Sequence, residues 1–122
     1  MKIIQQSEKV IARIEKSDTE RQKIIGMIEN AQDYHVTDFE VDAENPKLYS
    51  EGGLLYNKKK IMPNGKTRLT LIAAPPDKKG TIEVTYGTEM IACDAFTNSK
   101  VSKVILPKTV TAITSYAFNN CR

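Results

Sequence analysis

Residues 101–121 read VSKVILPKTVTAITSYAFNNC, and this stretch decides the fold that the sequence predicts. Residues 82–99, just before it, read IEVTYGTEMIACDAFTNS. With an offset of 22 residues and no gap, the apolar positions of the two stretches coincide. The matching pairs are Ile82 with Val104, Val84 with Leu106, Ile91 with Ile113, Ala95 with Ala117, and Phe96 with Phe118. Self-similarity at a period of about 20 to 50 residues is typical of stacked-repeat architectures.

The repeat predicts a β-rich solenoid of short parallel strands, preceded by an α-helical N-terminal segment. We expect residues 82–84 and 104–106 to lie side by side as parallel strands, because they occupy the same place in consecutive repeats. Phe96 and Phe118 should be almost fully buried at equivalent positions. With three Phe and no Trp among 122 residues, the remaining core must be mostly aliphatic.

Two sets of residues carry a family resemblance. The last repeat has an apolar phrase ending in proline, a Val/Ile pair, and a closing Ala-Phe pair with a cysteine: Val101, Val104, Leu106, Pro107, Val110, Ile113, Ala117, Phe118 and Cys121. Upstream, a longer phrase runs through a hairpin: Val36, Phe39, Val41, Asp42, Asn45, Pro46, Tyr49, Gly53, Leu54, Leu55, Tyr56, Leu71, Ile72 and Pro75. Together, over residues 34–122, they resemble the BspA-like, or Treponema-type, leucine-rich repeats. The middle repeat departs from that pattern at Lys79 and Thr85.

The resemblance implies a domain organisation and a function. A long hairpin-bearing repeat would occupy residues 34–80, and short repeats residues 81–100 and 101–122, after a helical segment or cap at residues 1–33. It implies a non-catalytic protein-binding module of bacteria, located at the cell surface or secreted, for adhesion or for binding a host or matrix protein. From another class, we consider a structural spacer or self-association unit that dimerises through the N-terminal helices or the open C-terminal end.

Residues 1–33 have apolar residues at helical spacing: Ile3, Ile4, Val10, Ile11, Ile14, Ile24, Ile25 and Ile28. Ser17 and Glu20 have the spacing of a helix-capping box. The segment therefore predicts either two short helices that break near Ser17 or one helix with a polar middle. Its apolar stripe would cover the first repeat or form a dimer contact. No secretory signal peptide and no membrane-spanning apolar run is found in the sequence.

Residues 54–57 and 69–73 read as two strands of a hairpin, with Met62, Pro63, Asn64 and Gly65 as its turn. The hairpin carries the one notable charge cluster: Lys58, Lys59, Lys60, Lys66 and Arg68. Such a cluster either attracts phosphate, an anionic (sulfated) glycan or an acidic protein, or keeps a strand edge from aggregating. No aromatic residue interleaves it and the net charge is only +3, so nucleic acid is not an expected partner.

Residues that could carry catalysis or hold a metal are scarce. His35 is the single histidine, and Cys93 and Cys121 lack the spacing of a zinc site. Asp38, Asp42 and Glu44 lie close together but lack the spacing of a calcium loop. The sequence therefore predicts no enzyme, no metal and no cofactor, and two free thiols that act as small buried hydrophobes.

Exposed positions on the predicted sheet face are the expected contacts for a protein partner. Glu40, Glu83 and Ile105 alternate with residues that should be buried, so their side chains should face solvent together. We expect a protein partner to meet the module on this face.

Overall fold

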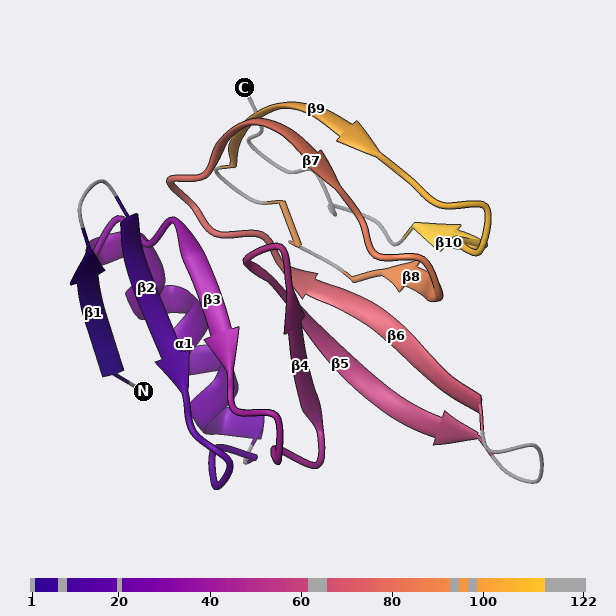
Figure 1. Cartoon of the computed structure of the whole chain (residues 1–122), viewed down its shortest axis with the longest axis horizontal. Helices are drawn as coiled ribbons and strands as arrows, with labels where there is room; N and C mark the ends of the chain where they lie inside the picture. The colour runs from indigo at the N-terminus through magenta and orange to yellow at the C-terminus, as the bar shows by residue number, and fades with distance from the viewer. Residues whose placement is uncertain are drawn as a thin grey trace.

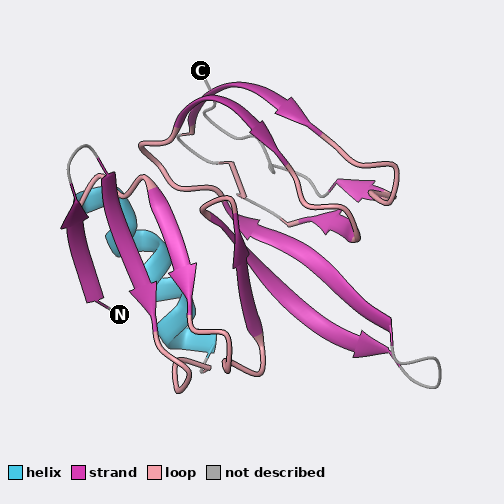
Figure 2. Ribbon diagram, viewed as in Figure 1, coloured by secondary structure: helices cyan, strands magenta, loops and turns pink. Residues whose placement is uncertain are grey.

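The computed structural model describes residues 2–6, 9–19, 21–61, 66–92, 95–96 and 99–113. This part of the chain forms ten strands, arranged in three sheets, and one helix (Figures 1 and 2). The predicted solenoid fold class is wrong, because the strands form mixed and antiparallel sheets rather than a stack of parallel repeats.

The first sheet has the order β1-β2-β3 and joins β1 (Lys2–Gln6), β2 (Lys9–Ile14) and β3 (Asp38–Val41). The pairing is antiparallel between β1 and β2 and parallel between β2 and β3. Helix α1 (Arg21–Asp33) makes the crossover between the two parallel strands, as parallel pairing requires. Met27 and Ala31 of α1 lie one helical turn apart and pack against buried residues of β2 and β3.

The predicted N-terminal helices are therefore wrong for residues 2–6 and 9–14, which form strands. Ile3 pairs with Ala12 and Ile4 with Ile11, and such β-branched residues favour strands. A short apolar run fits a helix or a strand almost equally well, so its spacing alone is ambiguous. The predicted capping box includes Glu20, which lies outside the described residues, and the helix begins at Arg21.

The second sheet has the order β10-β8-β6-β5-β4. Its strands are β4 (Leu48–Glu51), β5 (Leu54–Ile61), β6 (Lys66–Ala73), β8 (Thr88–Ile91) and β10 (Ala112–Ile113). The strands β4, β5 and β6 are antiparallel neighbours, whereas β8 and β10 add parallel to β6. The predicted hairpin is confirmed as β5 and β6, and its turn at residues 62–65 lies outside the described residues.

The third sheet pairs β7 (Lys79–Glu83) with β9 (Lys100–Ile105) in parallel. Ile82 lies beside Val104, which confirms the strand pairing predicted from the 22-residue offset. The same offset places Ile91 of β8 beside Ile113 of β10. The self-similarity thus produces two short parallel ladders, while the antiparallel β4, β5 and β6 give the molecule a different architecture.

In the part of the chain that the structure describes, two apolar clusters form the core, one on each side of the second sheet. Leu55 belongs to the cluster that includes α1 and the first sheet, and its neighbours Leu54 and Tyr56 belong to the cluster beneath β7 and β9. Successive strand residues point to opposite faces, so β5 contributes to both clusters. Phe96 is fully buried in the second cluster, as predicted, whereas Phe118, Cys93 and Cys121 lie outside the described residues.

Within the described residues, no helix combines the length and the apolar character that crossing a bilayer requires.

Candidate functional site

Three predicted contact residues are exposed, but they do not share one sheet face. Glu83 of β7 and Ile105 of β9 are cross-strand neighbours. Glu40 lies on β3, in the first sheet, where it accepts a hydrogen bond of 2.6 Å from Arg13. The prediction of one common face is therefore wrong, since β3 pairs with β2 rather than with β7.

The predicted basic residues lie at the far end of the β5-β6 hairpin (Figure 1). The Lys58 N–H still donates to the Lys47 carbonyl at the edge of the second sheet. Beyond it, the backbone pairs Lys59 with Arg68 and Ile61 with Lys66, outside the reach of β4 and β8. The hairpin thus brings Lys58, Lys59, Lys60, Lys66 and Arg68 to one projecting two-stranded ribbon, as the sequence predicts.

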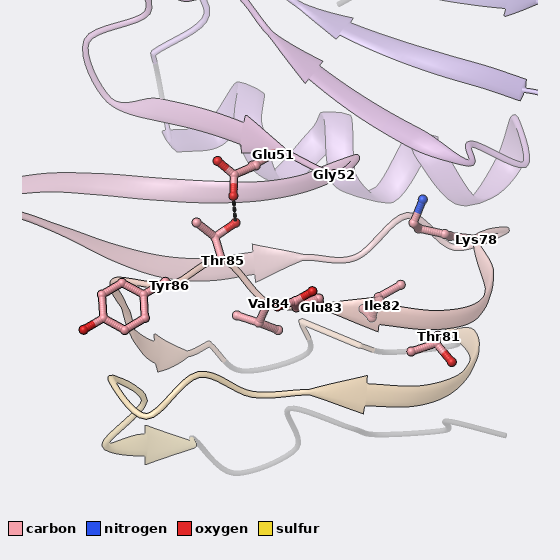
Figure 3. A pocket seen from close by; sticks show the side chains of 9 residues that line it. All are labelled: Glu51, Gly52, Lys78, Thr81, Ile82, Glu83, Val84, Thr85 and Tyr86. Atoms are coloured by element: carbon pink, nitrogen blue, oxygen red, sulfur yellow. Dashed lines mark hydrogen bonds between the residues drawn. The ribbon is translucent and has the colours of Figure 1, made fainter.

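A hollow of about 500 Å³ opens between the turn that follows β4 and the strand β7 (Figure 3). We call this hollow the β7 groove. Its walls are Glu51, Gly52 and Lys78 on one side and the unbroken run of residues 81–86 on the other. One face of a strand would contribute only every second residue. Since buried Ile82 and Val84 line the groove together with exposed Thr81 and Glu83, the groove runs along the backbone edge of β7.

The hydrogen bonds of β7 show which edge is open. The Val84 N–H donates to the Ile105 carbonyl of β9 at 2.9 Å, so Val84 turns its backbone groups toward β9. The next amide points the other way, because the Thr85 N–H donates to the Tyr56 hydroxyl at 2.9 Å. Backbone groups alternate along a strand, so the N–H and C=O of Glu83 also face away from β9. Among the described residues, β9 is the only strand paired with β7, and this edge remains open.

Glu51 closes one end of the groove and is firmly held. Its carboxylate accepts a hydrogen bond of 2.5 Å from the Tyr49 hydroxyl. It also accepts one of 2.7 Å from the Thr85 hydroxyl (Figure 3). These two donors lower the pKa of Glu51, and the same carboxylate raises the pKa of Tyr49 to about 12. Glu51 is therefore ionised at neutral pH, and its side chain is fixed at the wall of the groove.

The Gly52 side of the groove is shaped by a tight turn. Gly52 and Gly53 have φ angles of +60° and +83°, which residues with a Cβ rarely adopt. A Cβ on Gly53 would collide with the Asp38 side chain, whose carboxylate lies 3.4 Å from the Lys78 ammonium. The Gly53 carbonyl accepts a hydrogen bond of 2.8 Å from the Phe39 N–H. These contacts hold the turn against β3. The space between the turn and β7 therefore stays open and forms the β7 groove.

A smaller hollow of about 240 Å³ lies on the other side of the same turn and is lined in part by Glu40. Glu51 and Gly52 border both hollows. Glu40 and Glu83, which the sequence predicts as contacts, therefore flank one turn from different sheets.

His35 is exposed, and its Nδ1 lies 3.5 Å from Asp77, which also pairs with Lys100 at 3.0 Å. Burial alone would raise the pKa of Asp77, but these two partners lower it. Among the described residues, no group of three or more His, Cys, Asp or Glu side chains is placed to hold a metal ion. The surroundings of His35 are those of a surface ion-pair cluster.

Comparison of the chain with protein-family models, with curated proteins and with solved structures finds no match in any of the three. The resemblance to BspA-like repeats therefore stays a prediction.

Glu83 is a predicted contact residue that lines the groove, whereas the sequence did not indicate the wall opposite it. That wall contains Glu51, which lies 34 positions before Thr85, and only the tertiary fold brings these two residues together. Of the available signals, the pair Gly52 and Gly53 marks a turn next to Glu51, but it does not reveal that the turn stops beside β7.

Proposed function

We propose that this chain is a non-catalytic protein-binding module whose β7 groove receives an extended segment of a partner polypeptide. The observation that carries this proposal is the open backbone edge of residues 81–86, with the Glu83 N–H and C=O directed into the groove. Addition of a partner strand to an exposed sheet edge is a common mode of peptide recognition, in which main-chain hydrogen bonds supply affinity.

The dimensions of the groove fit a short strand. From residue 81 to residue 85 the edge measures about 13 Å, since a strand rises about 3.3 Å per residue. The fixed turn at Gly52 gives the incoming chain a second wall, and the Thr85 N–H at one end is already satisfied by Tyr56. A segment of about four residues would therefore pair with the open part of β7 and end near Glu51.

The family resemblance adds what the partner would be. It predicts adhesion at a bacterial surface and a host or matrix protein as the ligand, and this part of the proposal depends on the resemblance alone. The basic ribbon keeps both of its interpretations, attraction of an anionic glycan and protection of the hairpin from aggregation.

The proposal is tested with an acetylated, amidated hexapeptide of alternating valine and serine and with a copy that is N-methylated at every residue, so that neither edge of the peptide keeps an N–H donor. We expect the first peptide to slow hydrogen exchange at the Glu83 amide, because a paired strand would accept its N–H. The N-methylated copy should have little effect, since it lacks the donors that pair with β7. Equal effects of both peptides, or no effect of either, would contradict the proposal.

Self-association is a second candidate function, favoured by a different surface. Ile105 and Leu106 at the end of β9 and Ile113 of β10 are exposed large apolar residues. Within the described residues, β9 and β10 end their sheets and have one unpaired edge each. Sedimentation of the wild type should show a dimer that Ile105→Lys dissociates, whereas Ser102→Lys on the same strand serves as the matched control. The alternative of dimerisation through N-terminal helices is withdrawn for residues 2–6 and 9–14, which are strands.

A further inference from the structure

We propose that the segment received by the β7 groove is basic, with Lys or Arg at alternate positions whose side chains lie against Glu83 and Glu51. This inference rests on the proposed function and adds the chemistry of the partner. Three observations support it: the excess of negative charge at the groove, the fixed carboxylate of Glu51, and the exposed Tyr86 at the same end.

The groove carries more negative than positive charge that is free to meet a partner. Of the described residues that line the groove, Lys78 alone is cationic, and its ammonium lies 3.4 Å from the Asp38 carboxylate. Glu83 is exposed, and its carboxylate has no ion-pair partner in the part of the chain that the structure describes. Among the described residues, the hydrogen-bond donors to Glu51 are both neutral hydroxyl groups. A basic partner would therefore supply the charge that the groove lacks.

The two carboxylates suit an extended chain. In a paired strand, a residue directly opposite Glu83 places its side chain on the same face of the sheet, with the two Cβ atoms about 5 Å apart. The next side chain on that face is two residues along the partner, about 7 Å away. Lysine or arginine at every second position would thus place one cation beside Glu83 and direct another toward the end of the groove where Glu51 lies.

Glu51 is prepared to meet a cation before the partner arrives. Hydrogen bonds from Tyr49 and Thr85 hold the carboxylate in one orientation, so little side-chain freedom is lost on binding. A carboxylate oxygen has lone pairs for more than one donor, so each oxygen can still accept a bond from an ammonium or guanidinium group.

Tyr86 adds a further contact at the same end. Its side chain is 79% exposed, and Figure 3 shows the ring projecting outward beyond Thr85. A cation held over a tyrosine face is attracted by the ring, and arginine makes this contact more often than lysine. The structure therefore favours arginine at the position of the peptide nearest Tyr86.

The test compares three acetylated, amidated hexapeptides that alternate valine with lysine, with serine or with glutamate. Affinity for the full chain is measured by calorimetry, and the position of binding by hydrogen exchange at the Glu83 amide. We expect the lysine peptide to bind about tenfold more tightly than the serine peptide, and the glutamate peptide more weakly than both. The ratio of the lysine-peptide affinity to the serine-peptide affinity should decrease at 1 M salt, because the Debye length is then about 3 Å.

Two variants separate the groove from the overall charge of the protein. Glu83→Lys should remove the preference for the lysine peptide over the serine peptide, so that the ratio of the two affinities falls to about one. Glu29→Lys makes the same change of charge on the exposed surface of α1 and should leave both affinities as in the wild type. An equal loss in the two variants would overturn the inference, because only the net charge would then matter.

The remaining outcomes are also decisive. If the serine and lysine peptides bind equally and both slow exchange at Glu83, the basic partner is wrong while the protein-binding function stands. If no peptide slows exchange there, both proposals fail. If the protein alone forms a dimer that the lysine peptide dissociates, the occupant is the basic ribbon of a second copy, and the inference of a separate basic partner is overturned.

Discussion

At the scale of single residues, Asn45 shows how one side chain can join two loops. It is 1% exposed, and its amide group uses all of its hydrogen-bonding positions. The amide nitrogen donates to the carbonyls of Glu15 and Asp18 at 2.9 and 3.1 Å, and the amide oxygen accepts from the Lys47 and Leu48 N–H groups at 2.9 Å. Asn45 thereby fixes the loop after β2 to the start of β4.

Asn45→Ala should lower the free energy of unfolding by about 3 kcal/mol, because it leaves buried backbone donors and acceptors without partners. Asn45→Asp is the matched comparison, since it keeps the acceptor for Lys47 and Leu48 but loses the donor. We expect an intermediate loss for Asn45→Asp in urea titrations at pH 7. A loss for Asn45→Ala below about 0.5 kcal/mol, typical of surface changes, would show that Asn45 does not join the loops.

Glu51 gives a pH prediction at the same scale. Its pKa is lowered in the folded chain by the Tyr49 and Thr85 hydroxyls, so its hydrogen bonds stabilise the fold above the ordinary value of 4.5. That stability is lost as the pH falls through the lowered pKa. When the pH is lowered from 5 to 2, the melting temperature of Glu51→Gln should therefore fall by less than that of the wild type. Glu29→Gln, which removes an exposed carboxylate elsewhere, is the control. An identical fall in melting temperature for the wild type and Glu51→Gln would show that the hydrogen bonds of Glu51 do not stabilise the fold.

Tyr49 provides the alkaline counterpart of this prediction. Its pKa of about 12 lies above the ordinary 10.0, so the stability from this bond is present below pH 10 and lost as the pH rises through about 12. Absorbance at 295 nm should show Tyr49 among the last tyrosines to ionise in the wild type. Glu51→Gln should bring its titration back toward 10.0.

At the scale of elements, the turn between β4 and β5 decides whether the groove exists. Gly53→Ala should destabilise the protein by about 3 kcal/mol, because it adds a collision with Asp38 to the strain of a positive φ. Gly52→Ala is the matched control, with a φ of +60° but no atom within 4 Å of the added Cβ. It should cost only about 1 kcal/mol. Equal losses in chemical denaturation would contradict the close packing of the turn on β3.

The same scale shows what the sequence could predict. The offset between residues 82–84 and 104–106 identified a parallel pair of strands, since a repeated apolar pattern places equivalent strands side by side. The hairpin of β5 and β6 was predicted from two apolar runs around a proline-glycine turn. Residues 2–6 and 9–14 were misread as helical, because Ile and Val at short spacing fit either element. Only the pairing of β2 with β1 and β3 decides between them.

The candidate site was harder to predict than these elements. Glu83 was identified from alternation along one strand, which is a local property. The groove, in contrast, depends on where the Gly52 turn stops, and contacts between β3, β4 and β5 determine that position. Glu51 in its wall is hydrogen-bonded to Thr85, which lies 34 positions further along the chain, and no local sequence pattern indicates this contact.

At the scale of the whole molecule, the second sheet joins the two apolar clusters. Phe96 and Phe39, at 0% and 2% exposure, belong to different clusters, and β5 contributes residues to both. Phe96→Ala and Phe39→Ala should each cost about 3–5 kcal/mol. Because the sheet is shared, thermal unfolding should remain a single transition in both variants. Two separate transitions in either variant would show that the halves unfold independently.

The open edge of β7 is the central claim, and amide hydrogen exchange of the free protein tests it most directly. The Val84 and Thr85 amides donate to Ile105 and to Tyr56, so both should exchange slowly. Glu83 lies between Ile82 and Val84. Its amide should exchange much faster than the amides of Val84 and Thr85, because it faces the groove. Exchange at Glu83 as slow as at Val84 in the unliganded monomer would show that the edge is already covered and would contradict the account.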